Sequence, residues 1–207
     1  MEDILSNNNK NFIERLESLK KQHQNNIVLR KNGTLLLSPN TMPKCKHMFF
    51  PPITEDLIEE FLRKPYKNQL PMEYENFLKY SNGVNLCYVK LIKKNFSHAL
   101  CLFVVFGLPR TQPYGRPLDM EEPYDIRIED LRRHKDIPQT WLKCGRYIKN
   151  YNFSNPHDIF IDTINHHVYG CENNSCKVSD AWDSLDDCFN NILESFADMK
   201  SEYVILT

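Results

Sequence analysis

Four side chains that can bind a metal ion lie close together near the C-terminal end of the sequence. They are His166, His167, Cys171 and Cys176. Imidazole nitrogen and thiolate sulfur are ligands that zinc prefers. However, a C-x4-C spacing matches no standard zinc ribbon or finger, and adjacent histidines on a strand point to opposite faces. We therefore interpret the stretch as a polar hairpin and expect no metal or other cofactor, with a zinc-dependent enzyme as the weaker alternative.

Two cysteines could act as nucleophiles if a histidine lay beside them in the fold. Cys101 and Cys144 are the candidates, and His98 and His134 are the available bases. A nucleophilic cysteine reacts as the thiolate, which apolar surroundings disfavour. Cys101 belongs to the most apolar run of the chain, residues 99–108. We therefore predict that both thiols are small side chains of the core.

Other catalytic patterns are weak. General acid–base catalysis needs two carboxylates held across a cleft, whereas the acidic pairs here are adjacent residues. These pairs are Glu59–Glu60, Glu121–Glu122 and Asp186–Asp187. The glycine-rich motifs that bind phosphate do not occur, and the chain has only 6 glycines. We therefore predict that the protein is not an enzyme.

The segment from Asp119 to Asp130 is different because it is strongly acidic. Arg127 is its only basic residue, and a turn-rich loop with aromatic residues precedes it. An acidic, aromatic surface suits a basic protein partner. A solvated helix start would explain the same charges. We predict that the partner binds at Tyr114, Asp119, Glu121, Glu122, Tyr124 and Asp125.

The composition sets the broad class of protein. Of the 207 residues, 41% are hydrophobic and 26% are charged, as in a globular protein with one core. Lys and Arg total 26 and Asp and Glu total 27, so the charge does not favour nucleic acid as a partner. The N-terminus lacks the features of a signal peptide, and the apolar runs are too short to span a membrane. Together with seven cysteines, which we expect to be free thiols, these features predict a cytoplasmic protein.

Periodicity predicts the elements of the first half of the chain. A first helix covers residues 11–24, and a second begins after Thr54 and ends at Pro65. A third begins at Pro71 and ends where Asn82 and Gly83 allow left-handed backbone. Asn-Gly at residues 32–33, between two apolar runs, predicts a β-hairpin. Residues 41–52 are predicted to be a connector.

The second half is predicted to be rich in strands. Expected strands cover residues 84–92, 100–108, 141–148, 159–164 and 167–171. A short helix is expected at residues 126–134. A last, strongly amphipathic helix is expected after Ser184, which with Asp187 resembles a capping box that has Asp in place of the usual Glu or Gln. Grouped strands with helices outside them predict an α+β fold, with a mostly antiparallel sheet covered on one face.

Two motifs, in this order, resemble one known family. The first is a Leu-Pro…Tyr…Phe-Leu…Asn-Gly pattern, formed by Leu70, Pro71, Tyr74, Phe77, Leu78, Asn82 and Gly83. The second is an Asp-x5-Val-Tyr strand pair that leads to a tryptophan and a terminal helix, at Asp162, Val168, Tyr169, Trp182 and Ser184. From about Phe50 to Phe196 the chain is similar to the SUKH superfamily, which includes the Smi/Knr-like proteins.

The resemblance implies an α+β fold without catalytic activity. Many bacterial members are immunity proteins that bind and neutralise toxins, often nucleases or deaminases, and other relatives are scaffolds or regulators. It implies structural roles for Pro71, Asn82, Gly83 and Trp182. Residues 1–49, a helix plus hairpin, have no counterpart in the family. We treat them as an N-terminal extension of a SUKH-like domain at residues 50–207, and expect one compact unit.

These observations lead to one main hypothesis and one alternative from another class. The first is a cytoplasmic immunity protein whose partner is a cognate protein toxin, with no nucleic acid and no membrane involved. Desolvated aromatic side chains would supply affinity, and acidic side chains would steer a basic toxin. The alternative is a regulatory scaffold that binds a host protein.

Overall fold

The computed structural model describes residues 11–31, 33–38, 45–63, 70–93, 96–107, 137–149, 155–172, 175 and 177–198. The helices among them are α2 (Phe12–Gln22), α3 (Glu55–Arg63), α4 (Met72–Tyr80) and α6 (Leu185–Asp198), with one 3-10 turn, η1 (Gln24–Asn26). The strands are β1 (Ile27–Leu29), β2 (Leu35–Leu37), β3 (Cys45–Phe49), β4 (Val84–Lys93), β5 (Phe96–Val105), β6 (Trp141–Tyr147), β7 (His157–Asp162), β8 (Val168–Glu172) and β9 (Val178–Trp182).

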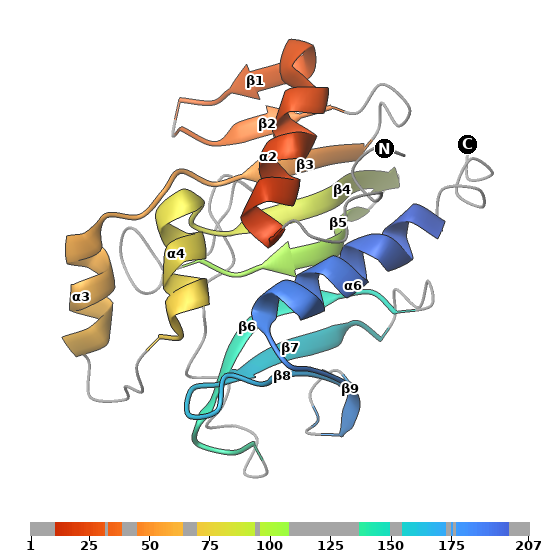
Figure 1. Ribbon diagram of the computed structural model, residues 1–207. Helices are drawn as coiled ribbons and strands as arrows, with labels where there is room; N and C mark the ends of the chain where they lie inside the picture. The colour runs from red at the N-terminus through yellow and green to blue at the C-terminus, as the bar shows by residue number, and fades with distance from the viewer. Residues whose placement is uncertain are drawn as a thin grey trace.

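The nine strands form one open sheet in which each strand pairs with its neighbours in sequence. The order runs from β1 to β9, and every neighbouring pair is antiparallel. Helices α2, α4 and α6 lie on one face of this sheet, and α3 lies beyond α4 (Figure 1). The predicted α+β class and antiparallel sheet are confirmed. Within the described ranges, no helix has the length and apolar character to cross a membrane.

The N-terminal helix and hairpin belong to this sheet and its core. The predicted hairpin is present as β1 and β2, and Gly33 has the positive φ of 86° that a tight turn needs. The predicted connector at residues 41–52 is wrong for part of its length, because Cys45–Phe49 form β3 and join the hairpin to β4. Three strands therefore precede the helices α3 and α4 in the chain.

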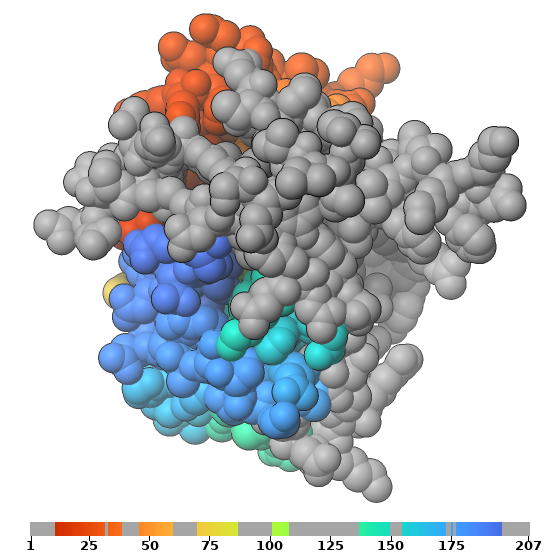
Figure 2. Space-filling view, turned by 90° about the vertical axis from the view of Figure 1, so that its right-hand side faces the viewer, coloured from red at the N-terminus to blue at the C-terminus, as the bar shows by residue number. Residues whose placement is uncertain are grey.

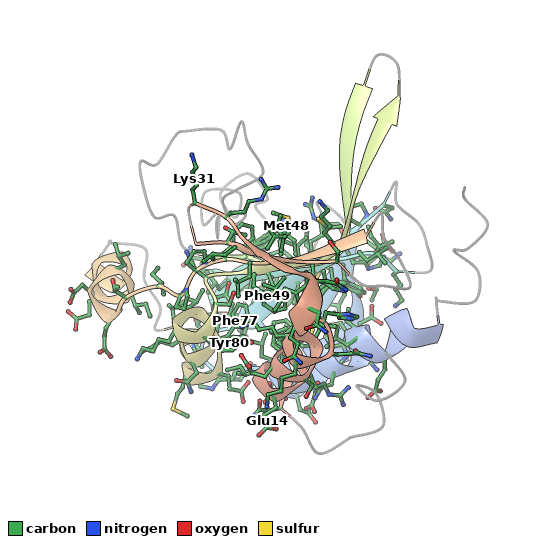
Figure 3. All side chains as sticks on the ribbon, turned by 90° about the horizontal axis from the view of Figure 1, so that it is seen from above. Glu14, Lys31, Met48, Phe49, Phe77 and Tyr80 are labelled. Atoms are coloured by element: carbon green, nitrogen blue, oxygen red, sulfur yellow. The ribbon has the colours of Figure 1, made fainter. Side chains whose placement is uncertain are left out.

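An aromatic cluster fills the space between the sheet and the helices. Phe12 of α2 lies 4.0 Å from Phe189 of α6 and 5.6 Å from Phe77 of α4, measured between ring centroids. Phe103 of β5 approaches Phe189 edge-on at 5.3 Å. Figure 3 shows Phe77 on the helix side of the sheet and Met48 on the opposite side. Such offset and edge-on ring pairs add to the stability that burial alone provides.

The Asn-Gly stretch after α4 connects this helix to the sheet. Pro71 is the N-cap residue rather than the first helical residue, and its carbonyl accepts hydrogen bonds from the N–H groups of Tyr74 and Glu75. The helix ends at Tyr80, with the extended Ser81 as C-cap, so the predicted left-handed exit lies later, at Gly83 (φ 98°). β4 begins at the next residue. These residue types therefore serve the change from helix to strand.

The last helix agrees closely with its predicted pattern. The Ser184 hydroxyl accepts a hydrogen bond from the Asp187 N–H at 3.0 Å, as the expected cap requires. The positions Leu185, Cys188, Phe189 and Ile192 are all buried. Strand β9, which precedes this helix, was missed because its sequence, VSDAW, mixes polar and apolar residues without regular alternation.

Candidate functional site

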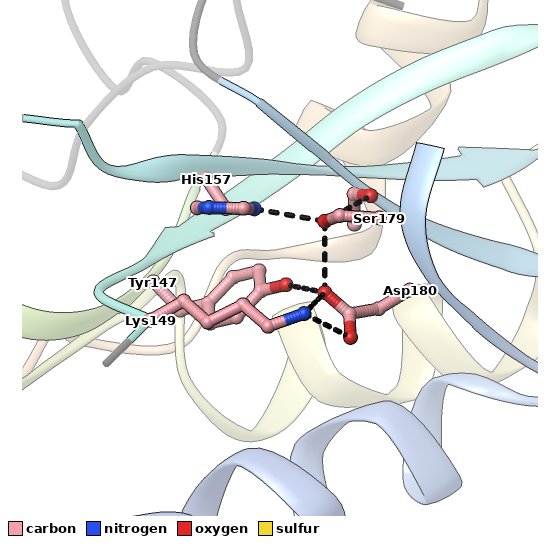
Figure 4. Close-up of polar contacts among 6 residues, drawn as sticks. Tyr147, Lys149, His157, Ser179 and Asp180 are labelled. Atoms are coloured by element: carbon pink, nitrogen blue, oxygen red, sulfur yellow. Dashed lines mark hydrogen bonds and ion pairs between the residues drawn. The ribbon is translucent and has the colours of Figure 1, made fainter. Parts of the chain in front are cut away.

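A network of polar side chains surrounds the carboxylate of Asp180 on β9 (Figure 4). Lys149 Nζ lies 2.6 and 2.7 Å from its two oxygens, and the Tyr147 hydroxyl donates to Oδ2. The Ser179 hydroxyl lies 2.8 Å from the same oxygen, and His157 Nδ1 lies 2.9 Å from Ser179 Oγ. We call these five residues the Asp180 network. It combines a serine, a histidine and a carboxylate, the residue types of a Ser-His-Asp triad.

Strand pairing brings these residues together from distant parts of the sequence. Tyr147 at the end of β6 is directly opposite His157 at the start of β7. Asp180 is opposite Gly170 of β8, and a side chain at Gly170 would occupy the space of the Tyr147 hydroxyl, since an added Cβ would lie 2.6 Å from it. The absence of a side chain at Gly170 therefore lets the tyrosine reach across β8 to Asp180.

The protonation states of the network follow from its contacts. Burial raises the pKa of the Asp180 carboxyl, but hydrogen bonds from Lys149, Tyr147 and Ser179 outweigh this effect, so its pKa lies below the usual value. Burial, and then the charge of Lys149, lower the pKa of His157. Burial and the neighbouring Asp180 raise the pKa of Tyr147. Near neutral pH the network thus contains an ionised aspartate, a charged lysine and a neutral histidine.

This arrangement is the reverse of a Ser-His-Asp triad. In a triad the carboxylate orients the histidine, and the histidine accepts the serine proton. Here the carboxylate contacts the serine, whose single proton can go to Asp180 or to the Gly170 carbonyl at 3.1 Å. The neutral His157 can then donate its Nδ1–H to Ser179 Oγ. The network holds β6, β7 and β9 together, and it does not activate the serine for nucleophilic attack.

A second polar cluster lies on the opposite face of the same strands. Lys143 Nζ lies 2.7 Å from Asp158 Oδ2, and their side chains are only 9% and 2% exposed. Arg146 donates through Nε to Asp158 Oδ1 at 2.9 Å and is 38% exposed. Two cations thus share one buried carboxylate, and Arg146 is the more exposed of the two.

Next to this cluster, two aromatic rings are stacked on the sheet. Trp141 of β6 and Tyr169 of β8 lie 4.4 Å apart with an interplanar angle of 11°, and both are half-buried. Phe160 lies on β7, between these two strands, and is directly opposite Tyr169. Its buried ring lies 5.8 Å from the Trp141 ring and packs beneath the stacked pair. The Trp141–Tyr169 pair is therefore a rigid, amphipathic surface element.

The predicted partner-binding residues Tyr114, Asp119, Glu121, Glu122, Tyr124 and Asp125 lie outside the described residues, as does the expected helix at 126–134. The same holds for Cys176 and His134. The structure therefore provides no positions for the acidic segment, and its role in partner binding stays a prediction.

The described zinc candidates lie at a turn and within the strand that follows it. His166 and His167 are exposed at the turn between β7 and β8, whereas Cys171 is fully buried further along β8. Cys171 follows His167 by four positions of extended backbone, about 13 Å at the usual rise per residue, and ligands of one zinc ion must lie much closer together. Among the described residues, no group of three or more His, Cys, Asp or Glu is arranged to hold a metal ion.

The nucleophile candidates differ in their surroundings. Cys144 is fully buried, and this burial raises the pKa of its thiol. Cys101 is only partly buried and packs against the core. Burial of Cys144 favours the neutral thiol, which is a poor nucleophile, and the placement of both agrees with their interpretation as core side chains.

The four residues to which the resemblance gives structural roles are all packed into the fold. Pro71 is buried at the start of α4, and Asn82 and Gly83 are buried just after its end. A Cβ on Gly107 would collide with the backbone of Asn82, so the two chain segments are in close contact. Trp182 packs edge-on against Tyr147, with ring centroids 6.1 Å apart. These positions fit structural roles and place the tryptophan directly beside the Asp180 network.

Comparisons with known proteins identify no relative. No family model matches the chain, and neither the curated proteins nor the solved structures contain a match.

Sequence analysis did not predict either polar cluster. The signal available for one of them was the mixture of basic, aromatic and apolar residues between Trp141 and Lys149, which a strand with two different faces explains. Pairing of that strand with residues 157–162 would have suggested the contact between Lys143 and Asp158. The contact between Lys149 and Asp180 depends on β9, and without that strand it could not be foreseen.

Proposed function

We propose that the chain is a non-catalytic immunity protein that binds a cognate toxin domain, for example a nuclease or a deaminase, and blocks its activity. The resemblance to the SUKH superfamily suggests this function, and the α+β fold with one helix-covered face is compatible with it. Among the described residues, several side chains that could take part in catalysis are instead engaged in contacts within the fold. The Asp180 network and the buried Cys144 are examples.

The Trp141–Tyr169 pair is the observation that carries this proposal. Tryptophan, tyrosine and arginine are the residue types most often responsible for binding energy in protein interfaces. Here a stacked Trp and Tyr lie on the same face as Arg146, which is held in place by Asp158. Because these side chains are already ordered, little conformational entropy is lost when a partner binds them.

The acidic segment at residues 119–125 has a different role in the proposal. Exposed carboxylates accelerate the encounter with a basic partner more than they strengthen the final complex. We propose that Asp119, Glu121, Glu122 and Asp125 steer the toxin, with Tyr114 and Tyr124 as additional contacts. The aromatic pair then supplies much of the affinity.

The first test is to purify a tagged copy of the chain from its native cells and identify the bound proteins by mass spectrometry. Recovery of a toxin domain whose activity is inhibited by the purified chain would support the proposal. Recovery of a host protein instead, with no inhibition of a toxin encoded next to this gene, would favour the regulatory scaffold.

Variants then separate the two parts of the surface. The double variant Trp141→Ala/Tyr169→Ala should raise the dissociation rate of the complex. Glu121→Lys/Glu122→Lys should lower the association rate and reduce its dependence on salt. Asp56→Lys/Asp183→Lys reverses two exposed charges elsewhere and should change neither rate. Unchanged affinity of both test variants would remove this face from the proposal.

A further inference from the structure

The open sheet has two edges, and they differ in character. Among the described strands, β1 pairs only with β2, and β9 pairs only with β8. Figure 2 shows the N-terminal elements, in red and orange, at the top of the molecule and the residues of β9 and α6, in blue, below them. The two edges therefore lie at opposite ends of the molecule, as the strand order requires.

Strand β9 has the features that protect an edge from pairing with another chain. It carries Asp180, which is bound to Lys149, and its pairing with β8 is interrupted by a bulge next to Cys171. Charged side chains and bulges are common protection at sheet edges. Strand β1 consists of Ile27, Val28 and Leu29 and has no such protection.

The side chains of β1 are unusually accessible for apolar residues. Val28 is 56% exposed and Leu29 is 68% exposed, and they are neighbours on the outermost strand. An exposed apolar edge strand is a template for pairing with another strand. Because β1 has only three residues, a second strand can pair with it in only a few registers.

Hydrogen bonding fixes which backbone groups of β1 face outward. The Arg30 N–H donates to the Thr34 carbonyl, and the Ser38 N–H donates to the Asn26 carbonyl. Val28 is opposite Leu36, midway between these two contacts. Because alternate residues of an antiparallel strand bond to the same neighbour, Asn26, Val28 and Arg30 bond to β2. The N–H and C=O groups of Ile27 and Leu29 therefore point to the outer edge.

We propose that β1 pairs with β1 of a second copy of this chain, antiparallel and centred on Val28. In this register the backbone of Ile27 forms hydrogen bonds with Leu29 of the second copy, and the backbone of Leu29 forms them with Ile27 of the second copy. All outward N–H and C=O groups of Ile27 and Leu29 then have a partner. Val28 is opposite its own counterpart in a non-hydrogen-bonded pair, where side chains approach closely. The two sheets then form one continuous sheet with two-fold symmetry.

The charges beside β1 favour the antiparallel orientation of this pairing over the parallel one. Arg30 and Lys31 follow the strand, and Asn25 and Asn26 precede it. Antiparallel pairing centred on Val28 places Arg30 opposite Asn26 of the second copy, so like charges are separated. A parallel arrangement would bring the basic residues of both copies together, which is unfavourable. The strand is thus complementary to itself.

Charge exchange at Val28 tests this register directly. The full chain should show a concentration-dependent monomer–dimer equilibrium in sedimentation velocity. Val28→Lys and Val28→Asp should each raise the dimer Kd by about tenfold or more, because identical charges then face each other. An equimolar mixture of the two variants should dimerise again, since each lysine then faces an aspartate.

An exposed apolar residue on another element provides the control. Met72 is an exposed apolar residue on α4, and Met72→Lys should leave the dimer Kd unchanged. If a Val28 variant does not fold, Leu29→Pro replaces it, because this proline removes an outward N–H and leaves the bonds to β2 intact. A wild-type chain that stays monomeric at all concentrations, or a mixture that fails to dimerise, would overturn the proposal.

Discussion

The carboxylate of Asp186, in the first turn of α6, accepts a hydrogen bond from the backbone N–H of Phe12 in α2, at 3.1 Å. The start of α6 is in turn bonded to α4, since the Leu185 N–H donates to Glu73 at 3.2 Å. N–H groups at helix starts have no partner within their own helix, and a negative side chain there also interacts favourably with the helix dipole. Helices from both ends of the chain are therefore connected through their first turns.

Replacement of Asp186 by alanine should destabilise the protein by about 1 kcal/mol, the usual cost of losing a cap. The reason is that the Phe12 N–H loses its acceptor beside a tightly packed ring. Chemical unfolding in urea, followed by circular dichroism, measures this difference. Asp186→Asn should cost less, because an amide oxygen can still accept the bond.

Asp187→Ala is the matched control for this contact. Asp187 lies in the same helical turn and carries the same charge, but its side chain is exposed. Its loss should cost only the interaction of an exposed charge with the dipole of α6, about 0.3 kcal/mol, and therefore clearly less than the loss of Asp186. Equal effects of the two alanine variants would contradict the assigned role of Asp186.

Asp158 is expected to be among the most sensitive charged residues. Its replacement by asparagine leaves Lys143 buried without a full countercharge, and breaking a buried pair in this way costs about 3–5 kcal/mol. The exposed pair between Lys177 and Glu172 provides the comparison, since Lys177→Met should change the unfolding free energy far less than Asp158→Asn does. A small effect of Asp158→Asn would show that water or a rearranged partner compensates Lys143.

The fold was more predictable than the clusters because it depends on local patterns. The helix after Ser184 and the turn at Gly33 each follow from residues close together in the sequence. Arg15 shows the limit of this approach. It lies within the predicted helix at residues 11–24, yet its side chain is 1% exposed and contacts Glu194 of α6 at 3.3 Å. Only the packing of two helices distant in sequence explains its burial.

The ends of strands and their pairing partners were also harder to predict, because they depend on contacts between elements that are distant in sequence. Residues 45–49 form a strand because β2 and β4 lie on either side of them. Their sequence, CKHMF, has no regular alternation that would distinguish it from a connector. The Asp180 network requires the register of β6, β7, β8 and β9 at once, and pairing registers are set by tertiary contacts.

The stability of the protein should depend on the protonation of His47. This side chain is buried, and burial together with the charge of His23 lowers its pKa to about 4. In the unfolded chain its pKa is about 6.5. The unfolded state therefore binds more protons between these values, so the stability contribution is complete above about pH 6.5 and is lost as the pH falls to about 4.

Unfolding free energies measured between pH 4 and 7 test this dependence. From the pKa difference, the loss across the window amounts to about 3 kcal/mol. His47→Phe should flatten the profile relative to the wild type, whatever its effect on stability at neutral pH. His166→Asn is the control, because this histidine is exposed and asparagine tolerates its positive φ of 64°. A profile of His47→Phe parallel to that of the wild type would contradict the assignment.

Gly170 should be required for the Asp180 network, and a double-mutant cycle can show why. In Gly170→Ala the new methyl group would lie 2.6 Å from the Tyr147 hydroxyl oxygen, so we expect a loss of about 1–3 kcal/mol from overpacking. Tyr147→Phe removes that oxygen. Gly170→Ala should therefore lower the unfolding free energy less in the Tyr147→Phe variant than in the wild type. Gly145→Ala is the control, since its methyl group would meet the Val104 carbonyl oxygen, and Tyr147→Phe should not reduce its cost. Additive effects of Gly170→Ala and Tyr147→Phe in urea unfolding would show that the tyrosine hydroxyl is not what limits residue 170 to glycine.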